Sequence, residues 1–533
     1  IMMGEGLFSH TNVETAYGTV RGNNGVFYRY APQRRKLINY AQFRMPNPWG
    51  IAFDDYGQDF FLHTSGTKLS WMMPGSVKSV YGVNIEAPDL ITSNQVRPTS
   101  GLEFVSSRHF PDEVQGDVLF NNAIGFLGAK QHRMIEDGTG FTTEHRQDLF
   151  VSDDLNFRPV DLEFAPDGSL YVVDWHNALI GHMQHSARDP LRDHAHGRIY
   201  RITYPSRPLV EPPQIAGASI AQLLENLKLP EYRARYRTKR ELRGRNASAV
   251  VAAATAWAAR QSDERLKLEA LWVTWGADQV DRALIDELFQ SDDHRIRAAV
   301  VRVIRFNDHQ IPDQAKLLLQ AAQDPHGRVR LEAVTAGSRL DQKTGEAILA
   351  AAESVGIDDH MFISFAHAKA ALAGEFLPKA VRGDELQAPA HLEGGDAKRF
   401  LQGAEIYERE GHCATCHQPD GKGLPDVGFP PLADTQWALG DPDRLIKLTL
   451  KGLMGPIEVK GKAYPGVVPM TPFGGLLKDD ELAAVLTYVR NAFGNKASAI
   501  RPGHVRRVRE EVEDMTGMYN PADLLEEHPF KQN

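Results

Sequence analysis

Short apolar segments alternate with turns over residues 1–205. Three of these segments share one pattern, in which an apolar strand is followed by a turn with glycine and a second apolar strand. Their anchoring aromatic residues are Phe53, Phe104 and Phe164, and this spacing slightly exceeds that of one four-stranded propeller blade. We therefore predict a partial, all-β propeller over residues 1–205. Propellers close with about four to eight blades, so we expect further blades, either N-terminal to Ile1 or supplied by a separate chain.

The pattern becomes helical over residues 215–375. An apolar residue followed by a basic one recurs at Tyr236-Arg237, Leu266-Lys267, Ile296-Arg297 and Val329-Arg330. This repeat predicts an α-solenoid of HEAT-like helices. Three turns are expected to supply N-caps of such helices, at residues 292–294, 324–326 and 358–360. Three tryptophans are expected in its core: Trp257, Trp272 and Trp275.

Residues 396–495 show a third pattern, which predicts an all-α domain. Its first helix is expected at Asp396–Arg409 and its last at Asp479–Phe493, with Gly494 as the stop. Gly403 in the first helix should allow a close crossing near Tyr488. Two segments flank this domain, namely a linker at residues 376–395 and a charged tail at residues 496–533 that we expect to pack on another domain.

Composition narrows the function only slightly. The chain has 533 residues, a net charge of −9 and an ordinary hydrophobic content of 42%. This charge gives no indication of nucleic-acid binding, and no apolar run is long enough to span a bilayer. The first residues lack the basic and apolar regions of a leader peptide. We therefore expect that a leader was removed or that the chain begins inside a longer polypeptide.

The chain has only two cysteines, and both lie in the sequence Cys413-Ala414-Thr415-Cys416-His417. Cys-x-x-Cys-His is the attachment sequence of a c-type haem, in which both thiols add to the vinyl groups and the histidine binds the iron. A redox disulfide or half of a zinc site is the alternative. A second cysteine pair for zinc does not exist in the sequence. Since this haem is attached outside the bacterial cytoplasm, we expect an exported protein that is periplasmic or lies at the cell surface.

A sixth iron ligand is expected downstream of the haem motif. Met470 precedes the last predicted helix, and Pro469 should hold its loop extended. Met454 is the alternative candidate for this ligand. The loop with Pro430 is expected to accept a hydrogen bond from the second nitrogen of His417. These spacings resemble those of class I cytochrome c domains over residues 396–495.

Three N-terminal motifs carry a wider resemblance: residues 156–161, 171–177 and 188–201. They resemble the propeller of the membrane-bound dehydrogenase-like haem proteins of Planctomycetes and Verrucomicrobia. That resemblance implies a propeller related to quinoprotein sugar dehydrogenases, then HEAT-like helices, then a cytochrome c. It implies no particular substrate. Pyrroloquinoline quinone and Ca²⁺, which quinoprotein dehydrogenases bind, cannot be matched to residues here.

Several polar residues at strand ends are weak catalytic candidates in the propeller. They are His63, Asp161, Asp174, His176, His194 and His196. Asp161 and Asp174 are expected to flank one hairpin, and two histidine pairs could bind a metal, His182 with His185 and His194 with His196. The alternative is a structural loop held by ion pairs. A basic run at residues 233–245 is likewise either a set of ion pairs with a neighbouring domain or a docking surface for an acidic partner.

Together these patterns predict a mono-haem electron-transfer protein with Cys413, Cys416, His417 and Met470 at its cofactor. Its redox partner would be a cytochrome or an oxidase. The propeller would then be a sugar or alcohol dehydrogenase that reduces the haem. The alternative is a scaffold subunit of a larger redox complex, in which the propeller and the helices are interaction surfaces.

Overall fold

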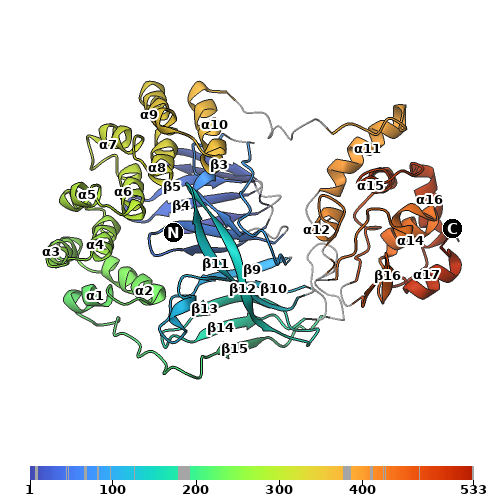
Figure 1. The fold of residues 1–533 in the computed structure, drawn as a ribbon, viewed down its shortest axis with the longest axis horizontal. Coiled ribbons are helices and arrows are strands. Elements are labelled where there is room, and N and C mark those ends of the chain that lie inside the picture. Colours follow the sequence, from blue (N-terminus) through green and yellow to red (C-terminus); the bar gives the residue numbers. More distant parts are fainter. Residues whose placement is uncertain are drawn as a thin grey trace.

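The computed structural model describes residues 1–533 except 7–9, 24, 44, 46, 65–68, 81–82, 97, 125, 178–191, 376–385, 409–411, 424, 426–427, 467–468 and 531–533. Strands occupy the centre of the view in Figure 1, an arc of helices lies on one side of them, and the C-terminal helices lie on the other. The chain is therefore a multidomain protein that combines many strands with many helices.

Antiparallel sheets make up the N-terminal part. Four of them have the strand orders β1-β4-β5, β6-β7-β8, β12-β11-β10-β9 and β13-β14-β15, and β2-β3 is a separate hairpin. The strands are β1 (Met2–Glu5), β2 (His10–Thr15), β3 (Gly18–Asn23), β4 (Val26–Ala31), β5 (Lys36–Gln42), β6 (Pro48–Phe53), β7 (Asp59–His63), β8 (Leu69–Trp71), β9 (Thr99–Phe104), β10 (Val118–Asn122), β11 (Gly128–Asp137), β12 (Gly140–Val151), β13 (Pro159–Phe164), β14 (Leu170–Asp174) and β15 (Arg198–Ile202).

The three aromatic positions of the repeated pattern occupy the same place in three sheets. Phe53 pairs with Asp59, Phe104 with Val118 and Phe164 with Leu170, each beside the turn of its hairpin. Each hairpin also has a register shift between its first and second strands. The first strands β6, β9 and β13 contact one another in chain order. The repeat in the sequence thus corresponds to a repeated structural unit.

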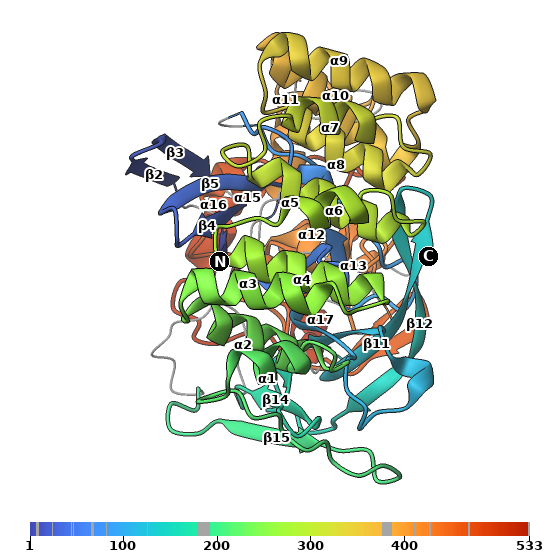
Figure 2. The same cartoon turned by 90° about the vertical axis from the view of Figure 1, so that its left-hand side faces the viewer.

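The helices after the sheets form a curved helical layer with an inner and an outer row, and its outer side faces the viewer in Figure 2. They are α1 (Ile220–Asn226), α2 (Tyr232–Arg243), α3 (Ala247–Ala258), α4 (Glu264–Gly276), α5 (Arg282–Leu288), α6 (His294–Phe306), α7 (Gln314–Ala321), α8 (Gly327–Gly337), α9 (Gln342–Val355) and α10 (Asp359–Ala373). Asp293 and Asp358 cap α6 and α10, as expected from their turns. In the third turn the cap is His326, whose ring nitrogen accepts from the backbone N–H of Arg328.

An apolar core continues from the sheets into the helical layer. It contains Phe27 and Trp71 of the sheets together with Trp257 and Val300 of the helices, all almost completely buried. Trp257 is therefore a core residue, as predicted. The other two tryptophans, Trp272 and Trp275, are only partly buried.

The C-terminal part has its own apolar core. Its elements are α11 (Gly394–Tyr407), α12 (Cys413–His417), α13 (Gln436–Leu439), α14 (Pro442–Lys451), β16 (Ile457–Val459), β17 (Lys462–Tyr464), α15 (Asp479–Val489), α16 (Pro502–Glu511) and α17 (Pro521–Glu527). The tail helix α16 packs on α14 and α15. The expected packing of the tail is thus made on the preceding C-terminal helices. A small antiparallel pair, β16-β17, is added to the predicted helices.

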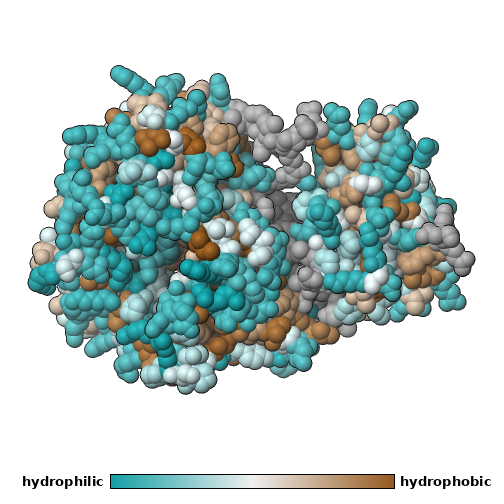
Figure 3. Space-filling view, viewed as in Figure 1, coloured by the Kyte–Doolittle hydropathy of each residue, from teal (hydrophilic) through white to brown (hydrophobic). Residues whose placement is uncertain are grey.

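Hydrophilic side chains cover most of the face seen in Figure 3. Within the part of the chain that the structure describes, no helix combines the length and the apolar character needed to cross a bilayer.

Candidate haem site

Two helices, α11 and α15, cross closely beside the Cys-x-x-Cys-His segment. A Cβ atom added at Gly403 would overlap the carbonyl oxygen of Ala484 and would lie 2.8 Å from Cβ of Tyr488. Glycine is therefore needed for this approach of the two backbones. The rings of Tyr407 and Tyr488 lie 5.2 Å apart beyond the crossing. The predicted contact between the first and the last helix of the domain is confirmed.

The Tyr407 side chain connects this crossing to the haem motif. Its hydroxyl donates a 2.7 Å hydrogen bond to the carbonyl oxygen of Gln418, the residue directly after α12. Gln418 has a φ of 63°, so the chain turns sharply there. The end of α12 is thus fixed to α11.

The short helix α12 holds both thiols. Cys413 and Cys416 are half-buried and are not joined by a disulfide. They lie three residues apart on one helical turn, so their sulfur atoms lie on the same side of it. Burial raises the pKa of the Cys413 thiol to about 12. Among the described residues no group of three or more His, Cys, Asp or Glu side chains is arranged to hold a metal ion. The zinc alternative therefore lacks its other ligands there.

His417 ends α12 with a defined tautomer. Its Nδ1 donates a 2.8 Å hydrogen bond to the carbonyl oxygen of Pro430, the contact expected from the sequence. Because a carbonyl oxygen only accepts, the proton is on Nδ1 and the lone pair is on Nε2. Burial lowers the pKa of His417, against the opposing effect of this hydrogen bond. A neutral imidazole with a free Nε2 lone pair and a fixed ring is the form that ligates iron.

The two candidate methionines lie in different environments. Met470 is half-buried against the apolar core of the C-terminal part. Its backbone N–H and carbonyl both pair with Leu453 at 2.9 Å. Met454 is 58% exposed. The arrangement therefore favours Met470 as the thioether that could reach a metal beside the core.

The Leu453–Met470 pairing was not predicted from the sequence. Gly452 permits it, because a Cβ atom at that position would lie 2.6 Å from the carbonyl oxygen of Met470. Gly452 also has a φ of 81°. Gly452 marks a place where the backbone could take an unusual conformation. The sequence does not show which distant segment pairs with Leu453, because that depends on the fold.

Two of the candidate haem-binding side chains and two apolar side chains pack against the same core. Cys413, Met470, Leu432 and Phe493 all pack against the C-terminal core as partly buried side chains. Two thiols, a neutral histidine and a thioether beside apolar side chains are the donor set that a covalently attached haem requires. The residues present fit this cofactor.

The weak catalytic candidates of the N-terminal sheets have structural contacts. The Asp174 carboxylate is buried and accepts from the backbone N–H of Arg158, from that of His176 and from Arg198 Nε, at 2.6–2.8 Å. Its oxygens are thus used within the fold. Asp161 lies in the same β13-β14 hairpin, as expected.

Two of the histidine candidates face one carboxylate, and the other two have different surroundings. His196 is exposed and its ring lies 2.9 Å from Asp193, and Nε2 of His176 lies 3.8 Å from the same carboxylate. His194 is exposed, and the buried His63 lies in the different sheet β6-β7-β8. His182 and His185 fall outside the described residues. These contacts agree with a loop held by ion pairs.

Most of the basic run at residues 233–245 forms internal ion pairs. Arg233 pairs with Glu103 of strand β9 at 2.7 Å, and Arg235 pairs with Asp55 beside strand β6. Lys239 pairs with Glu269 of helix α4 at 2.8 Å. Of the two interpretations of this run, the structure therefore supports ion pairs with a neighbouring domain.

Comparison with known proteins identifies two regions. Residues 400–493 match the cytochrome c family model, and residues 74–206 match a domain of unknown function, DUF7133. Cytochrome c-552 of Thermus thermophilus is 41% identical over 125 residues, which are 22% of this chain and 80% of that protein.

Two longer relatives match over a smaller share of their length. The cytochrome c subunit of the alcohol dehydrogenase (quinone) of Gluconobacter oxydans is 35% identical over 97 residues, 18% of this chain and 19% of the relative. The gluconate 2-dehydrogenase cytochrome c subunit of Pantoea cypripedii is 34% identical over 121 residues, 22% of this chain and 25% of the relative. The chain thus spans about a fifth to a quarter of these two subunits.

Proposed function

The chain belongs to the cytochrome c family through its C-terminal domain, and from this premise we propose that it is an exported, mono-haem electron-transfer protein. Cys413 and Cys416 would hold the haem by thioether bonds, and His417 and Met470 would bind its iron. The observation that carries this proposal is the hydrogen bond from His417 Nδ1 to Pro430, which leaves Nε2 free beside two thiols.

Each residue has a separate task in this proposal. Haem c, when bound, supplies an iron that exchanges one electron between its ferrous and ferric states. Pro430 keeps the ring of His417 in one orientation and raises the basicity of Nε2. The sulfur of Met470 would favour the reduced state of a bound haem and so raise its potential. Phe493 and Leu432, which are partly buried against the same core, would shield the site from water.

We further propose that the four N-terminal sheets are blades of a β-propeller and that α1–α10 are HEAT-like repeats. The common register of Phe53, Phe104 and Phe164 supports the first assignment. The contacts of α2 with α4, α4 with α6 and α6 with α8 support the second. The same proposal includes the domain limits given above, with the propeller at residues 1–205, the helical repeats at 215–375 and the cytochrome c domain at 396–495.

The electron donor would be a dehydrogenase that oxidises a sugar or an alcohol, located in the propeller or in a partner. This assignment is supported by the relatives named as cytochrome c subunits of an alcohol dehydrogenase and a gluconate dehydrogenase. We cannot match the residues at the sheet ends to a quinone site, because the oxygens of Asp174 are used by the fold and His63 belongs to another sheet. We therefore derive no step through pyrroloquinoline quinone or Ca²⁺.

The test is optical and uses the natively purified protein in its oxidised form. Sugars and alcohols are added one at a time, with and without pyrroloquinoline quinone and Ca²⁺. Reduction by one substrate would support a dehydrogenase that passes electrons to the haem. Reduction only by a partner cytochrome would support an electron carrier. If neither reduces it while dithionite does, the scaffold role is correct and electron transfer is wrong.

A further inference from the structure

A large cavity lies between the N-terminal sheets and the inner helices of the helical layer. Its volume is about 770 Å³, and its lining comes from strands β4 and β6 and from helices α2, α4, α6 and α8. Small-molecule sites have volumes of roughly 300–1,000 Å³. The cavity is therefore large enough for an organic ligand.

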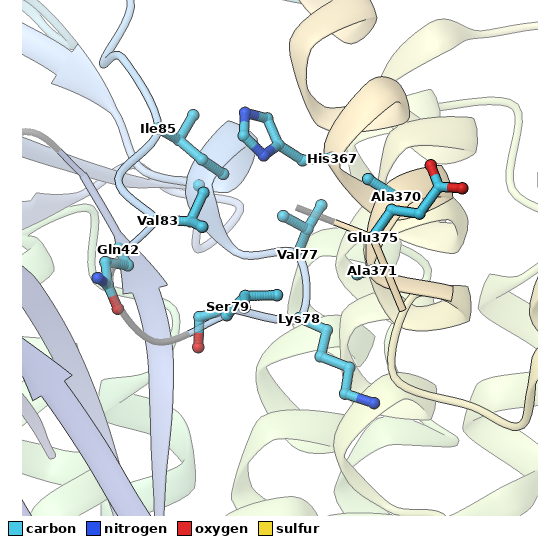
Figure 4. A pocket seen from close by; sticks show the side chains of 12 residues that line it. Gln42, Val77, Lys78, Ser79, Val83, Ile85, His367, Ala370, Ala371 and Glu375 are labelled. Atoms are coloured by element: carbon cyan, nitrogen blue, oxygen red, sulfur yellow. The ribbon is translucent and has the colours of Figure 1, made fainter. Parts of the chain in front are cut away.

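A second cavity, shown in Figure 4, provides a contrast. It lies between His367 of α10 and the segment with Val77, Val83 and Ile85, and its volume is only about 20 Å³. That space holds about one water molecule. Of these two cavities, the larger one can accept a ligand of several atoms.

Aromatic rings form much of the wall of the large cavity. The rings of Trp275 and Phe306 are nearly parallel, at an angle of 13° and with centroids 6.1 Å apart. The guanidinium of Arg29 lies 4.1 Å from the Phe306 centroid and 5.0 Å from that of Trp275. Tyr236 and Trp272 also line the space. Such faces bind rings and the apolar faces of sugars.

Basic side chains exceed acidic ones in the cavity. Among the described lining residues there are ten Lys or Arg and seven Asp or Glu. Several of the acids already have partners, since Glu103 pairs with Arg233, and Glu269 pairs with Arg235 and Lys239. The remaining positive charge is thus not neutralised by the wall itself.

Two of the arginines in this surplus, Arg29 and Arg243, are close enough to repel each other. Within the part of the chain that the structure describes, neither Arg29 nor Arg243 has a carboxylate partner. Burial lowers the pKa of Arg29 to about 10, and repulsion from Arg305 and Arg243 adds to this effect. Burial also lowers the pKa of Arg243. A negative charge between them would relieve this repulsion.

We propose that this cavity binds a small organic anion, with its carboxylate or phosphate at Arg29 and Arg243 and its ring or polyol against the aromatic wall. Arginine binds carboxylates and phosphates through paired N–H groups, and aromatic faces supply the apolar contact. Sugar acids and sugar phosphates have this combination of groups. The proposal does not depend on the haem site, which lies in the C-terminal domain.

Binding is tested by calorimetry on the full-length protein, because Ile1 and Met2 also border the cavity. The probes are D-glucuronate, D-glucose 6-phosphate and D-glucose. We expect one or both anions to bind at least tenfold more tightly than glucose. Binding of glucuronate alone would identify a carboxylate ligand, and binding of the sugar phosphate alone a phosphate ligand.

Arg243→Gln is the test variant, and Arg237→Gln is its matched control on the same helix α2. Arg243 lines the cavity, whereas Arg237 does not. We expect R243Q to weaken anion binding at least tenfold and R237Q to change it less than twofold. The proposal is overturned if neither anion binds, if glucose binds equally well, or if both variants weaken binding equally.

Discussion

The C-terminal domain and the N-terminal part differ in how they use polar residues. In the C-terminal domain the candidate haem-binding residues Cys413, Cys416 and His417 lie on the short helix α12, and a single hydrogen bond from His417 sets its tautomer. In the N-terminal part, polar groups pair across long sequence distances, as Arg328 does with Glu136. A compact motif therefore indicates chemistry here, and dispersed ionisable residues mainly hold sheets against helices.

The largest effect is expected at the α11–α15 crossing in the C-terminal domain. Gly403→Ala places a methyl group on the carbonyl oxygen of Ala484. We expect a loss of about 3 kcal/mol in the unfolding free energy of the C-terminal domain, because backbone must move to admit the side chain. Denaturant unfolding followed by absorbance of the haem-loaded domain measures it.

Gly395→Ala is the control on the same helix. Nothing lies within 4 Å of a Cβ atom added there, and its φ is not positive. We expect no loss and a small gain in stability. Equal effects of G403A and G395A would contradict the close crossing.

The role of ion pairs in the N-terminal part can be tested at a buried pair. Glu332→Gln removes the charge that faces Arg302, and both side chains are almost completely buried. We expect a loss of about 3 kcal/mol, because the arginine charge remains buried without its partner. Asp286→Asn, in the exposed pair with Arg282, should cost less than about 0.5 kcal/mol. Thermal unfolding of the two variants would refute the account if their losses were the same.

The two methionines sharpen the assignment of the iron ligand. Met470→Ala should lower the midpoint potential on the order of 0.1 V, since a thioether ligand raises it and axial ligands set the potential over a wide range. Met454→Ala should leave the potential unchanged because Met454 is exposed. Spectroelectrochemical titration measures both. A lower potential in M454A alone would assign the ligand to Met454.

The smallest expected effect concerns the stacked rings of His294 and His326, whose centroids are 3.5 Å apart. Burial, then repulsion from His294 and Arg328, lowers the pKa of His326 to about 4. In the unfolded chain this histidine has its ordinary pKa of roughly 6.5. As the pH falls below that value, the unfolded chain therefore binds a proton before the folded chain does. The contribution of the neutral His326 to stability is therefore fully present above about pH 6.5 and is lost as the pH falls towards 4. Glu136 and Asp324 raise the pKa of His326 and oppose its lowering only in part.

His326→Asn tests this pH dependence, because asparagine keeps an N-cap and does not titrate. We expect the loss of stability between about pH 6.5 and pH 4 to become smaller by roughly 1 kcal/mol, a modest value because the ring is only half-buried. Denaturant unfolding at several pH values measures it. An unchanged pH profile in H326N would show that other groups cause the loss.

The sequence predicted features that rest on short spacings. It located the haem motif, the glycine crossing and the hydrogen bond from His417 to Pro430, because each has a local pattern. It did not predict the pairing of Leu453 with Met470 or the partners of Arg233, since these depend on segments that meet only in the fold. The roles of His63 and Asp161 in a reaction remain predictions.

The same limit explains why the sequence did not predict the large cavity. Trp275 was predicted to be a core residue from its hydrophobicity, yet it lines a space shared with Arg29, which is far away in sequence. A pattern of apolar positions marks which side chains leave water, but not whether protein atoms or a ligand replace it.

The most direct test of the central claim is the pyridine haemochrome spectrum of the natively purified protein after extraction with acidic acetone. We predict a c-type spectrum that stays with the polypeptide, one haem per chain, and its loss in the Cys413→Ala/Cys416→Ala double variant. Haem that moves into the acetone, or a native protein without a haem spectrum, would contradict covalent attachment at Cys413 and Cys416.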